Sequence, residues 1–313
     1  MTEQRRKRLV VILGPTATGK SRCGIALARR VGGEIISGDS MLVYRGMDIG
    51  TAKPSAEELA LVPHHLVNIL SPEASFSVVE FREQAARLIS DILGRGHLPI
   101  LVGGTGLYIR SLLEDYQFSS VGSDPGFRQQ WEHFAATEGN QALHDKLAAL
   151  DPAAAARLHP NDVRRVVRAL ETAMRGETVS QQRQGTPVYD AIVFGLTMDR
   201  ALLYERINAR VDAMIRAGLE EEVRHLLEAG VQPGCQSMKS LGYRQMAEYL
   251  SGQCDFATAV DNIKKGTRHF AKRQLTWYRQ MPYVHWLTLD RSLNYEQCVS
   301  DMAALLAQRW EKS

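Results

Sequence analysis

The chain has 313 residues, of which 44% are hydrophobic and 23% charged, and its formal net charge is +3. This is the composition of an ordinary globular protein that can bury a core, in one large domain or two smaller ones. The net charge is too small to indicate nucleic-acid binding, so any such surface must come from local clusters of Lys and Arg.

The cysteines and the N-terminus exclude further classes. Cys23, Cys235, Cys254 and Cys298 form no CxxC pair, and their spacing suits neither a zinc site nor a dense disulfide framework. The basic N-terminal segment runs into an apolar stretch that is too short for a signal peptide core or a membrane span. We therefore expect free thiols, no membrane association and a cytoplasmic location.

The first third of the chain alternates strands with helices. Apolar, β-branched runs predict strands at Leu9–Leu13, Glu34–Ser37 and Pro99–Val102, with a weaker candidate at His65–Leu70. Helical spacing predicts helices at Lys20–Val31 and Ser77–Leu93, both ended by glycines. This order predicts an α/β fold with a parallel sheet flanked by helices.

The pattern changes near residue 121. Helical segments are predicted at Phe127–Thr137, Asn140–Leu150 and Asp162–Arg175, with no convincing strand between them. A strand returns at Tyr189–Met198, followed by a long helix at Asp199–Ala229, a glycine-containing loop, a helix at Phe256–Gln280, a strand at Val284–Leu289 and a terminal helix. We expect an α/β core of residues 1–122 and 188–313, with residues 123–187 as an all-helical insertion.

A phosphate-binding loop lies between the first strand and the first helix. The stretch GPTATGKS, from Gly14 through Thr16, Ala17, Thr18, Gly19 and Lys20 to Ser21, matches GxxxxGK[ST]. Glycines let successive backbone N–H groups point at phosphate oxygens, Lys20 supplies charge, and the Ser21 hydroxyl can ligate Mg²⁺. A structural glycine turn is the alternative, but the flanking strand and helix favour a P-loop like that of NTPases, with Mg²⁺ as the cofactor.

The identity of the phosphate is less obvious. P-loop NTPases commonly hold their metal with an acid after a later strand, and the strand at Pro99–Val102 ends in Gly103-Gly104-Thr105-Gly106 instead. The loop could therefore bind ATP, as its motif suggests, or hold a diphosphate without any γ-phosphoryl transfer.

Two polar residues follow the second and third predicted strands. Asp39 and Thr105 would share the crevice at the carboxyl ends of the parallel strands with the phosphate loop. Asp39 could orient a metal or act as a general base. Helix capping is the alternative role for both residues.

Two basic clusters could bind RNA. Lys264, Lys265, Arg268, His269, Lys272 and Arg273 share one helical face that Arg279 extends, and Arg164, Arg165 and Arg168 form a second cluster. Solvated charged faces are the alternative for each. Trp277, Tyr278 and Tyr283 could stack on bases, although core or rim packing is the commoner role.

Seven motifs resemble the bacterial tRNA dimethylallyltransferase (isopentenyltransferase) family and cover nearly the whole chain. They are GPTATGKS, ISGDSMLVYRGMDIGTAKP from Ile36, LVGGTGLYIRSLL from Leu101, HPNDVRRVVRALE from His159, RINARVDAMIRAGLEEEV from Arg206, KSLGYRQM from Lys239 and AKRQLTWYR from Ala271. A generic kinase would not share GDS followed by GMDIGTAKP. No C-terminal zinc finger like that of eukaryotic relatives is present in the sequence.

The resemblance implies transfer of a dimethylallyl group from dimethylallyl diphosphate to the exocyclic N6 of the adenosine 3′-adjacent to the anticodon in tRNA. It implies that Asp39 is the general base, that Thr105 lies near the reacting amine, that Arg210 binds diphosphate and that Thr16 to Ser21 hold the donor.

The resemblance also implies contacts with the tRNA anticodon stem-loop. These contacts fall on Asp39, Ser40, Met41 and Leu42, on Val163, Arg164, Arg165, Val166 and Val167, and on Lys239, Ser240, Leu241, Gly242, Tyr243 and Arg244. Nothing in the sequence requires a dimer, so we expect a monomer. A small-molecule kinase, an adenylate isopentenyltransferase acting on AMP, and a non-catalytic RNA-binding module are the alternatives.

Overall fold

The computed structural model describes residues 6–114, 116, 118, 122, 124–177 and 188–310. The chain divides into two compact units, Met1–Leu113 with Val188–Ser313, and Glu114–Pro187. The first boundary lies at Leu113 rather than at residue 122, because the chain leaves the core where helix α4 (Gly106–Leu113) ends.

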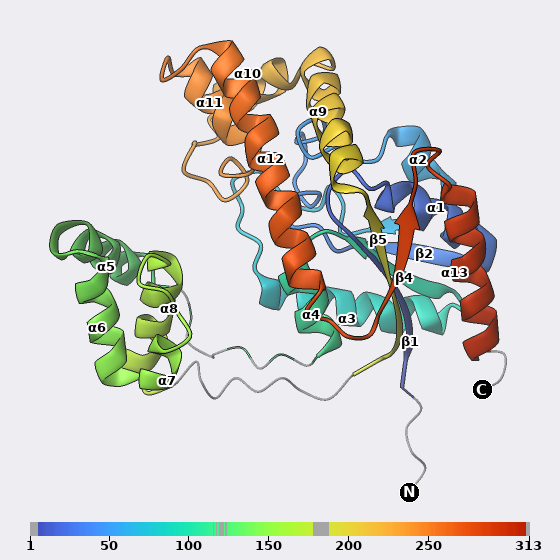
Figure 1. Ribbon diagram of the computed structural model, residues 1–313, viewed down its shortest axis with the longest axis horizontal. Coiled ribbons are helices and arrows are strands. Elements are labelled where there is room, and N and C mark those ends of the chain that lie inside the picture. Colours follow the sequence, from blue (N-terminus) through green and yellow to red (C-terminus); the bar gives the residue numbers. More distant parts are fainter. Residues whose placement is uncertain are drawn as a thin grey trace, which may run out of the picture. The chain divides into compact units, whose positions relative to one another are not determined.

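The first unit contains a six-stranded sheet whose strand pairs are all parallel (Figure 1). The strand order is β3 (His64–His65), β2 (Gly33–Ser37), β4 (Leu98–Gly103), β1 (Arg8–Leu13), β5 (Asp190–Met198) and β6 (Val284–Leu289). Strand β1 pairs with β4 on one side and with β5 on the other. The loop that follows β1 therefore lies at the centre of the sheet's carboxyl edge, where ligands bind in such sheets.

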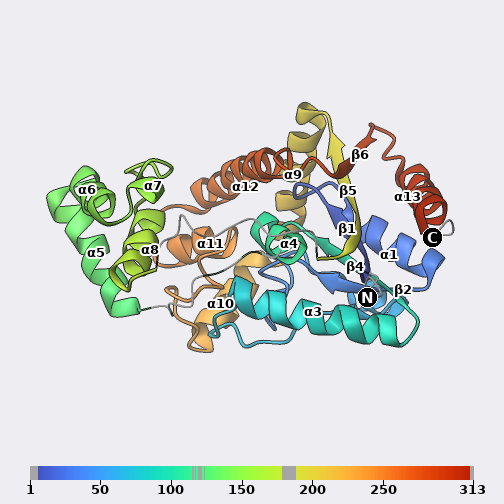
Figure 2. The ribbon, with the colours of Figure 1, turned by 90° about the horizontal axis from the view of Figure 1, so that it is seen from below.

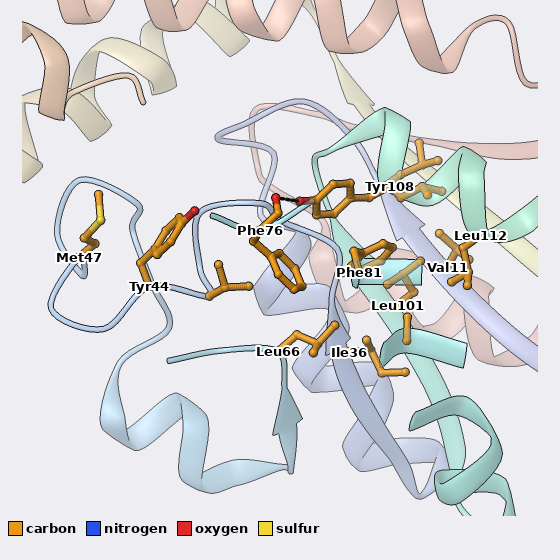
Figure 3. Packing of buried hydrophobic residues seen from close by; sticks show 14 of the residues in the cluster. Val11, Ile36, Tyr44, Met47, Leu66, Phe76, Phe81, Leu101, Tyr108 and Leu112 are labelled. Atoms are coloured by element: carbon orange, nitrogen blue, oxygen red, sulfur yellow. Dashed lines mark hydrogen bonds between the residues drawn. The ribbon is translucent and has the colours of Figure 1, made fainter. Parts of the chain in front are cut away.

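Alternate residues of β1 enter two different cores. Leu9, Val11 and Leu13 belong to one buried cluster, and Val10 and Ile12 belong to another. In the first cluster the rings of Phe81 and Tyr108 stack with centroids 4.3 Å apart. Figure 3 shows this cluster, with the Tyr108 hydroxyl donating to the Phe76 carbonyl at 3.1 Å. Burial on both faces explains why the central strands are continuous apolar runs.

Helices cover both faces of the sheet (Figures 1 and 2). The first core includes residues of α3 (Val78–Gly94), α4, α10 (Leu219–Glu228), α11 (Tyr243–Leu250) and α12 (Phe256–Tyr278). The second includes residues of α1 (Lys20–Val31), α9 (Arg200–Arg216) and α13 (Tyr295–Trp310). The α/β fold with a P-loop-like parallel sheet is confirmed.

Three expected elements differ from those observed. The long helix expected at Asp199–Ala229 is two helices, α9 and α10, because Gly218 adopts a φ of 96° between them. The strand expected at His65–Leu70 is reduced to β3, because Leu66 and Asn68 have positive φ angles that a strand cannot contain. The expected loop after residue 229 contains α11, and the short α2 (Ala56–Leu61) was also not predicted.

The described residues of the second unit form helices joined by turns and loops, without a strand. The unit contains α5 (Pro125–Glu138), α6 (Asn140–Leu150), α7 (Pro152–Ala155) and α8 (Val163–Met174), around a core that includes Leu143, Leu147 and Leu170. Residues 123 and 178–187 of the expected insertion lie outside the described range. None of the helices that the structure describes in either unit is long and apolar enough to cross a membrane.

Candidate active site

A cavity of about 510 Å³ opens at the carboxyl ends of β1, β2 and β4, within the first unit. Its polar floor comes from the loops after these three strands, and its apolar wall includes Ile207, Val211 and Met214 of α9 with Ile263 and Phe270 of α12. A cavity of this size can hold a small ligand, and the pairing of a polar floor with an apolar wall suits an amphipathic one.

The phosphate loop forms one end of the floor. Gly14, Ala17 and Gly19 have positive φ angles of 155°, 66° and 85°, which turn the backbone sharply between β1 and α1. Thr18 is fully buried, and its hydroxyl donates to the Pro15 carbonyl at 2.8 Å. The loop's surface in the cavity therefore consists of the other predicted donor-binding residues, Thr16, Ala17, Gly19, Lys20 and Ser21.

Gly14 and Thr18, which were also predicted to bind the donor, have a different place in the loop. The two residues shape the loop from behind, and neither is among the residues that line the cavity. An added Cβ at Gly14 would lie 2.7 Å from the Leu196 carbonyl oxygen of β5, which is why glycine is required there. The Thr18 hydroxyl is bonded inside the loop, so a contact of Thr18 with the donor would be made by its backbone N–H.

Asp39 and Thr105 meet beside this loop, as their positions after β2 and β4 predicted. The backbone N–H of Ser40 donates to the Thr105 hydroxyl oxygen at 3.1 Å, and the backbone N–H of Met41 donates to Asp39 Oδ1 at 2.8 Å. Lys20 Nζ and Asp39 Oδ2 lie 3.8 and 3.9 Å from the position that a Cβ on Gly104 would occupy. Asp39 is followed by a turn rather than a helix, so it does not act as a helix cap.

The close approach of the loops after β2 and β4 depends on glycine. An added Cβ at Gly103 would lie 2.3 Å from the carbonyl carbon and oxygen of Gly38, a distance that no side chain can adopt. The backbone N–H of Thr105 donates to the same Gly38 carbonyl at 3.2 Å. These contacts set the separation between Asp39 and Thr105.

Lys20, Arg210 and Asp39 influence one another's charge at the floor. Burial, reinforced by the Arg210 charge, lowers the pKa of Lys20 to about 8, and Asp39 partly opposes this shift. Burial also lowers the pKa of Arg210, and the charge of Asp39 again acts in the opposite direction. A site in which cations are partly dehydrated attracts a polyvalent anion strongly, because that anion replaces the lost solvation.

Residues missed in the sequence hold the floor together. Gln274 of α12 accepts a hydrogen bond from the Thr16 backbone N–H at 2.9 Å and donates to the Gly104 carbonyl at 2.7 Å. The Tyr278 hydroxyl donates to the same carbonyl at 2.6 Å. Gln274 and Tyr278 lie on the buried face of α12 with Ala271, a helical spacing that could have indicated an inward-facing amide.

Glu222 of α10 orders the loop at one side of the cavity and was also missed. Its carboxylate accepts the backbone N–H groups of Asp48 and Ile49, both at 2.8 Å, and that of Gly50 at 3.1 Å. The Tyr243 hydroxyl donates to it at 2.6 Å. Gly50, Thr51 and Ala52 of this loop line the cavity, and the Thr51 carbonyl accepts from Arg210 at 3.5 Å.

The residues predicted to contact tRNA separate into three groups. Those that line the cavity are Asp39, Ser40, Met41, Leu42, Lys239, Ser240, Leu241 and Gly242. Arg164 and Arg165 are exposed on α8 in the second unit, and Val163 is half-buried there. Arg244 is exposed beside Glu248.

Three of those predictions need correction. Val166 and Val167 are buried in the core of the second unit, so their side chains are not available to RNA. Tyr243 is also fully buried, with its hydroxyl on Glu222. The family resemblance implied these contacts for continuous stretches of chain, but helical periodicity turns these three side chains inward.

The predicted basic clusters are partly engaged within the protein. On α12, Lys264 pairs with Asp212 at 2.6 Å and Arg268 donates to Asn208 at 2.7 Å, both on α9. Lys265, His269, Lys272, Arg273 and Arg279 remain exposed. On α8, Arg168 binds the buried Glu171 at 2.6 Å, a carboxylate that Arg128 also contacts, so Arg168 is a structural residue.

The predicted aromatic residues are mainly packed. Tyr278 is buried against the phosphate loop, and Trp277 covers Gly106, where an added Cβ would lie 2.2 Å from its ring. Tyr283 is 38% exposed. Packing rather than stacking on bases therefore accounts for Trp277 and Tyr278.

The oxygen atoms present fit a magnesium ion that is held jointly with a ligand. Ser21 and Asp39 both line the cavity and offer a hydroxyl and a carboxylate. Mg²⁺ prefers oxygen ligands and is commonly held by one or two protein groups together with substrate phosphates. The described residues contain no group of three or more His, Cys, Asp or Glu that could hold a metal by themselves.

Comparisons with known proteins agree with this geometry. Residues 42–281 match the family model described as IPP transferase. A tRNA dimethylallyltransferase of Halalkalibacterium halodurans is 45% identical over 312 residues, covering 98% of this chain and 99% of the relative. One of Desulforudis audaxviator is 50% identical over 286 residues, covering 90% and 92%.

Solved structures show the same similarity. A full-length tRNA isopentenylpyrophosphate transferase from Bacillus halodurans has a TM-score of 0.73 and 44% identity, covering 98% of this chain and 99% of its own. A eukaryotic dimethylallyltransferase acting on tRNA has a TM-score of 0.81 and 27% identity, covering 98% and 80%.

Proposed function

The chain belongs to the IPP transferase family, and on that premise we propose that it alkylates tRNA with dimethylallyl diphosphate. The dimethylallyl group is transferred to the exocyclic N6 of the adenosine 3′-adjacent to the anticodon, and diphosphate is released. Asp39 acts as the base, and Lys20 and Arg210 bind the leaving group. Mg²⁺, when bound through Ser21 and the diphosphate, would neutralise part of the leaving group's charge.

The observation that carries the proposal is the position of Asp39. An Asp39 carboxylate oxygen and the Lys20 ammonium both lie within 4 Å of one point on the cavity floor, the position of an added Cβ on Gly104. The cationic loop can hold an anionic leaving group there, with a base within reach of the nucleophile. The apolar wall from α9 and α12 gives the hydrocarbon part of an allylic diphosphate a matching surface.

The reaction requires one bond to form and one to break. The N6 nitrogen attacks the allylic carbon, the bond from that carbon to the diphosphate oxygen breaks, and its electron pair leaves with the diphosphate. Asp39 takes the N6 proton. An allylic carbon ionises readily, so the main task is to stabilise the departing charge, which Lys20, Arg210 and the loop N–H groups do from fixed positions.

The acceptor must leave the base stack to reach the floor. Extrusion of a base costs a few kcal/mol, which contacts elsewhere on the RNA have to offset. The polar edge formed by Lys239, Ser240 and Gly242 lines the cavity, and Arg273 lies at the same cavity. Exposed Arg164 and Arg165 of the second unit give further phosphate contacts.

The residues that we propose for the donor site all come from one chain, which supports a monomer, and a tRNA substrate supports a cytoplasmic location. A kinase remains the second candidate, because the loop matches the ATP-binding motif. Strand β4 ends in glycines and Thr105, so it offers no acid for a nucleotide-bound metal.

Mass analysis of tRNA tests the proposal. Incubation of the protein with dimethylallyl diphosphate and unmodified tRNA should add one C5 unit to the adenosine beside the anticodon. AMP serves as a competing acceptor, and γ-labelled ATP as a competing donor. Transfer of label from ATP to a small acceptor, with unaltered tRNA, would establish the kinase instead, and prenylation of AMP alone would establish an adenylate enzyme.

A further inference from the structure

The phosphate loop contains a strained residue at its centre. Ala17 adopts a φ of 66°, in the left-handed region that residues with a Cβ rarely occupy. This conformation lasts only when surrounding contacts enforce it. The contact that does so involves the Ala17 carbonyl oxygen, which accepts a hydrogen bond from Arg206 Nε of α9 at 2.9 Å.

Arg206 is itself held by α13. Its Nη2 donates to the Tyr295 hydroxyl at 3.1 Å, and the Tyr295 ring lies against Gly19. An added Cβ at Gly19 would lie 2.5 Å from Tyr295 Cε1 and from its hydroxyl oxygen. The side of the loop that faces away from the cavity is therefore braced by α9 through Arg206 and by α13 through Tyr295.

The hydrogen bond from Arg206 fixes the direction in which the Ala17 carbonyl points, and this direction matters for anion binding. A loop that binds diphosphate must present N–H groups to the ligand and keep its carbonyl oxygens away, because those oxygens repel an anion. Arg206 draws the Ala17 carbonyl toward α9 with a charged donor, which is the stronger kind of hydrogen bond. Arg206 also lies one helical turn before Arg210, so its charge adds to the positive potential of the floor.

We propose that Arg206 is a positioning residue for the donor, which holds the phosphate loop in its anion-binding shape without touching the diphosphate. The inference rests on the proposed function, since it assumes that the loop binds the diphosphate of the donor. Tyr295 acts indirectly, because its hydroxyl accepts a hydrogen bond from the guanidinium of Arg206 and fixes its position.

Binding of inorganic diphosphate tests the role without any chemistry. We expect Arg206→Met to raise its dissociation constant about ten- to hundred-fold, the range expected for loss of a hydrogen bond to a charged group. Arg206→Lys keeps the charge but cannot form both hydrogen bonds, so its dissociation constant for diphosphate should lie between those of wild type and Arg206→Met. Tyr295→Phe, which removes only the acceptor of Arg206, should weaken binding a few-fold.

Arg200→Met is the matched control. It removes the same charge from the first turn of the same helix, where Arg200 is exposed and lies over the Tyr204 ring. Its diphosphate affinity should equal that of wild type. In turnover, the Arg206 variants should raise KM for the prenyl donor while KM for tRNA stays constant, a split that general destabilisation would not produce.

Equal diphosphate affinity in Arg206→Met and Arg200→Met would overturn the inference. If Arg206→Met does not fold, the affinity of Tyr295→Phe for diphosphate decides. A value equal to that of wild type would then overturn the inference. Failure of wild type to prenylate tRNA while it binds diphosphate would overturn the proposed function and leave the role of Arg206 in anion binding to be judged by the same affinities.

Discussion

The side-chain oxygen of Gln274 accepts a hydrogen bond from the backbone N–H of Thr16 at 2.9 Å. This bond attaches α12 to the phosphate loop. The same amide donates to the Gly104 carbonyl at 2.7 Å. One side chain thereby ties the loop after β1 to the turn after β4. A side-chain amide suits this position, because its oxygen accepts from one partner and its NH₂ group donates to the other.

Gln274→Leu should lower the free energy of unfolding by about 1–3 kcal/mol, because it leaves the Thr16 N–H without its partner. The Gly104 carbonyl keeps the Tyr278 hydroxyl, which limits the loss. Denaturant unfolding measures the change, and Gln280→Leu, at an exposed position just after α12, is the control. A Gln274 variant as stable as the Gln280 variant would show that the bridge contributes nothing.

Local patterns predicted most of the sheet and the helices that cover it. Strands β1, β2 and β4 are buried on both faces, so their apolar runs are unambiguous, and the glycine loop lies where motif and topology agree. The break at Gly218 was not predicted, because apolar spacing continues on both sides of it. A glycine in a helical pattern does not by itself show that it will adopt the left-handed conformation that Gly218 has in the structure.

Reasoning from the residues alone placed in the site only those that follow strands, whereas Arg210 and Lys239 to Gly242 came from the family resemblance. Asp39, Thr105 and Lys20 come after β2, β4 and β1, and parallel strands bring their carboxyl ends together. Gln274 lies 258 residues from Thr16 in the chain, and Arg206 lies 189 residues from Ala17. Such pairings depend on how helices pack against the sheet, which no local spacing encodes.

Asp39→Asn should reduce kcat by about 10²–10⁴-fold, the range for loss of a general base. Asparagine retains an oxygen for the Met41 N–H, so the turn is preserved. The affinity for tRNA should remain close to that of wild type, because a base acts mainly in the transition state. Single-turnover assays and equilibrium binding together check this, and an unchanged rate would remove Asp39 from the mechanism.

Donor binding should weaken as the pH rises through about 8. Below that pH Lys20 is charged and affinity is flat, and above it a proton must be taken up before the diphosphate binds. The lowered pKa also means that burial of Lys20 opposes folding fully below pH 8, and that this cost falls as the pH rises toward the ordinary value of 10.5.

Titration of diphosphate affinity between pH 6.5 and 9.5 checks this, with Lys20→Arg as the comparison. Arginine stays charged, so the decline near pH 8 should disappear in that variant. Since Asp39 raises the pKa of Lys20, Asp39→Asn should move the decline to lower pH. A decline that persists unchanged in Lys20→Arg would assign it to another group.

The arginines of α8 should separate into two classes. Arg164→Ala with Arg165→Ala should weaken tRNA binding and flatten its salt dependence, because both side chains are exposed. Arg168→Ala should instead destabilise the second unit, because it removes one partner of the buried Glu171 carboxylate. Salt-dependent binding and thermal unfolding distinguish the two, and a salt slope equal to that of wild type in the double variant would exclude this contact.

Glu222→Gln should disturb the loop that carries Gly50 and Thr51. The carboxylate accepts three backbone N–H groups and the Tyr243 hydroxyl, and the NH₂ group of glutamine would face donors on one side. We expect a loss of about 1.5–3 kcal/mol in unfolding free energy, the range for hydrogen bonds to a charged group. KM for the donor should rise as well, because the Thr51 carbonyl, which accepts from Arg210, moves with the loop.

Glu221→Gln is the control for this variant, since Glu221 is the exposed neighbour on the same helix. Denaturant unfolding measures the free energy of unfolding, and titration of the donor at constant tRNA measures its KM. If both variants match wild type in stability, the carboxylate does not hold the loop. If Glu222→Gln loses stability but keeps its donor KM, Arg210 is positioned independently of Thr51, and the diphosphate site depends on α9 alone at that point.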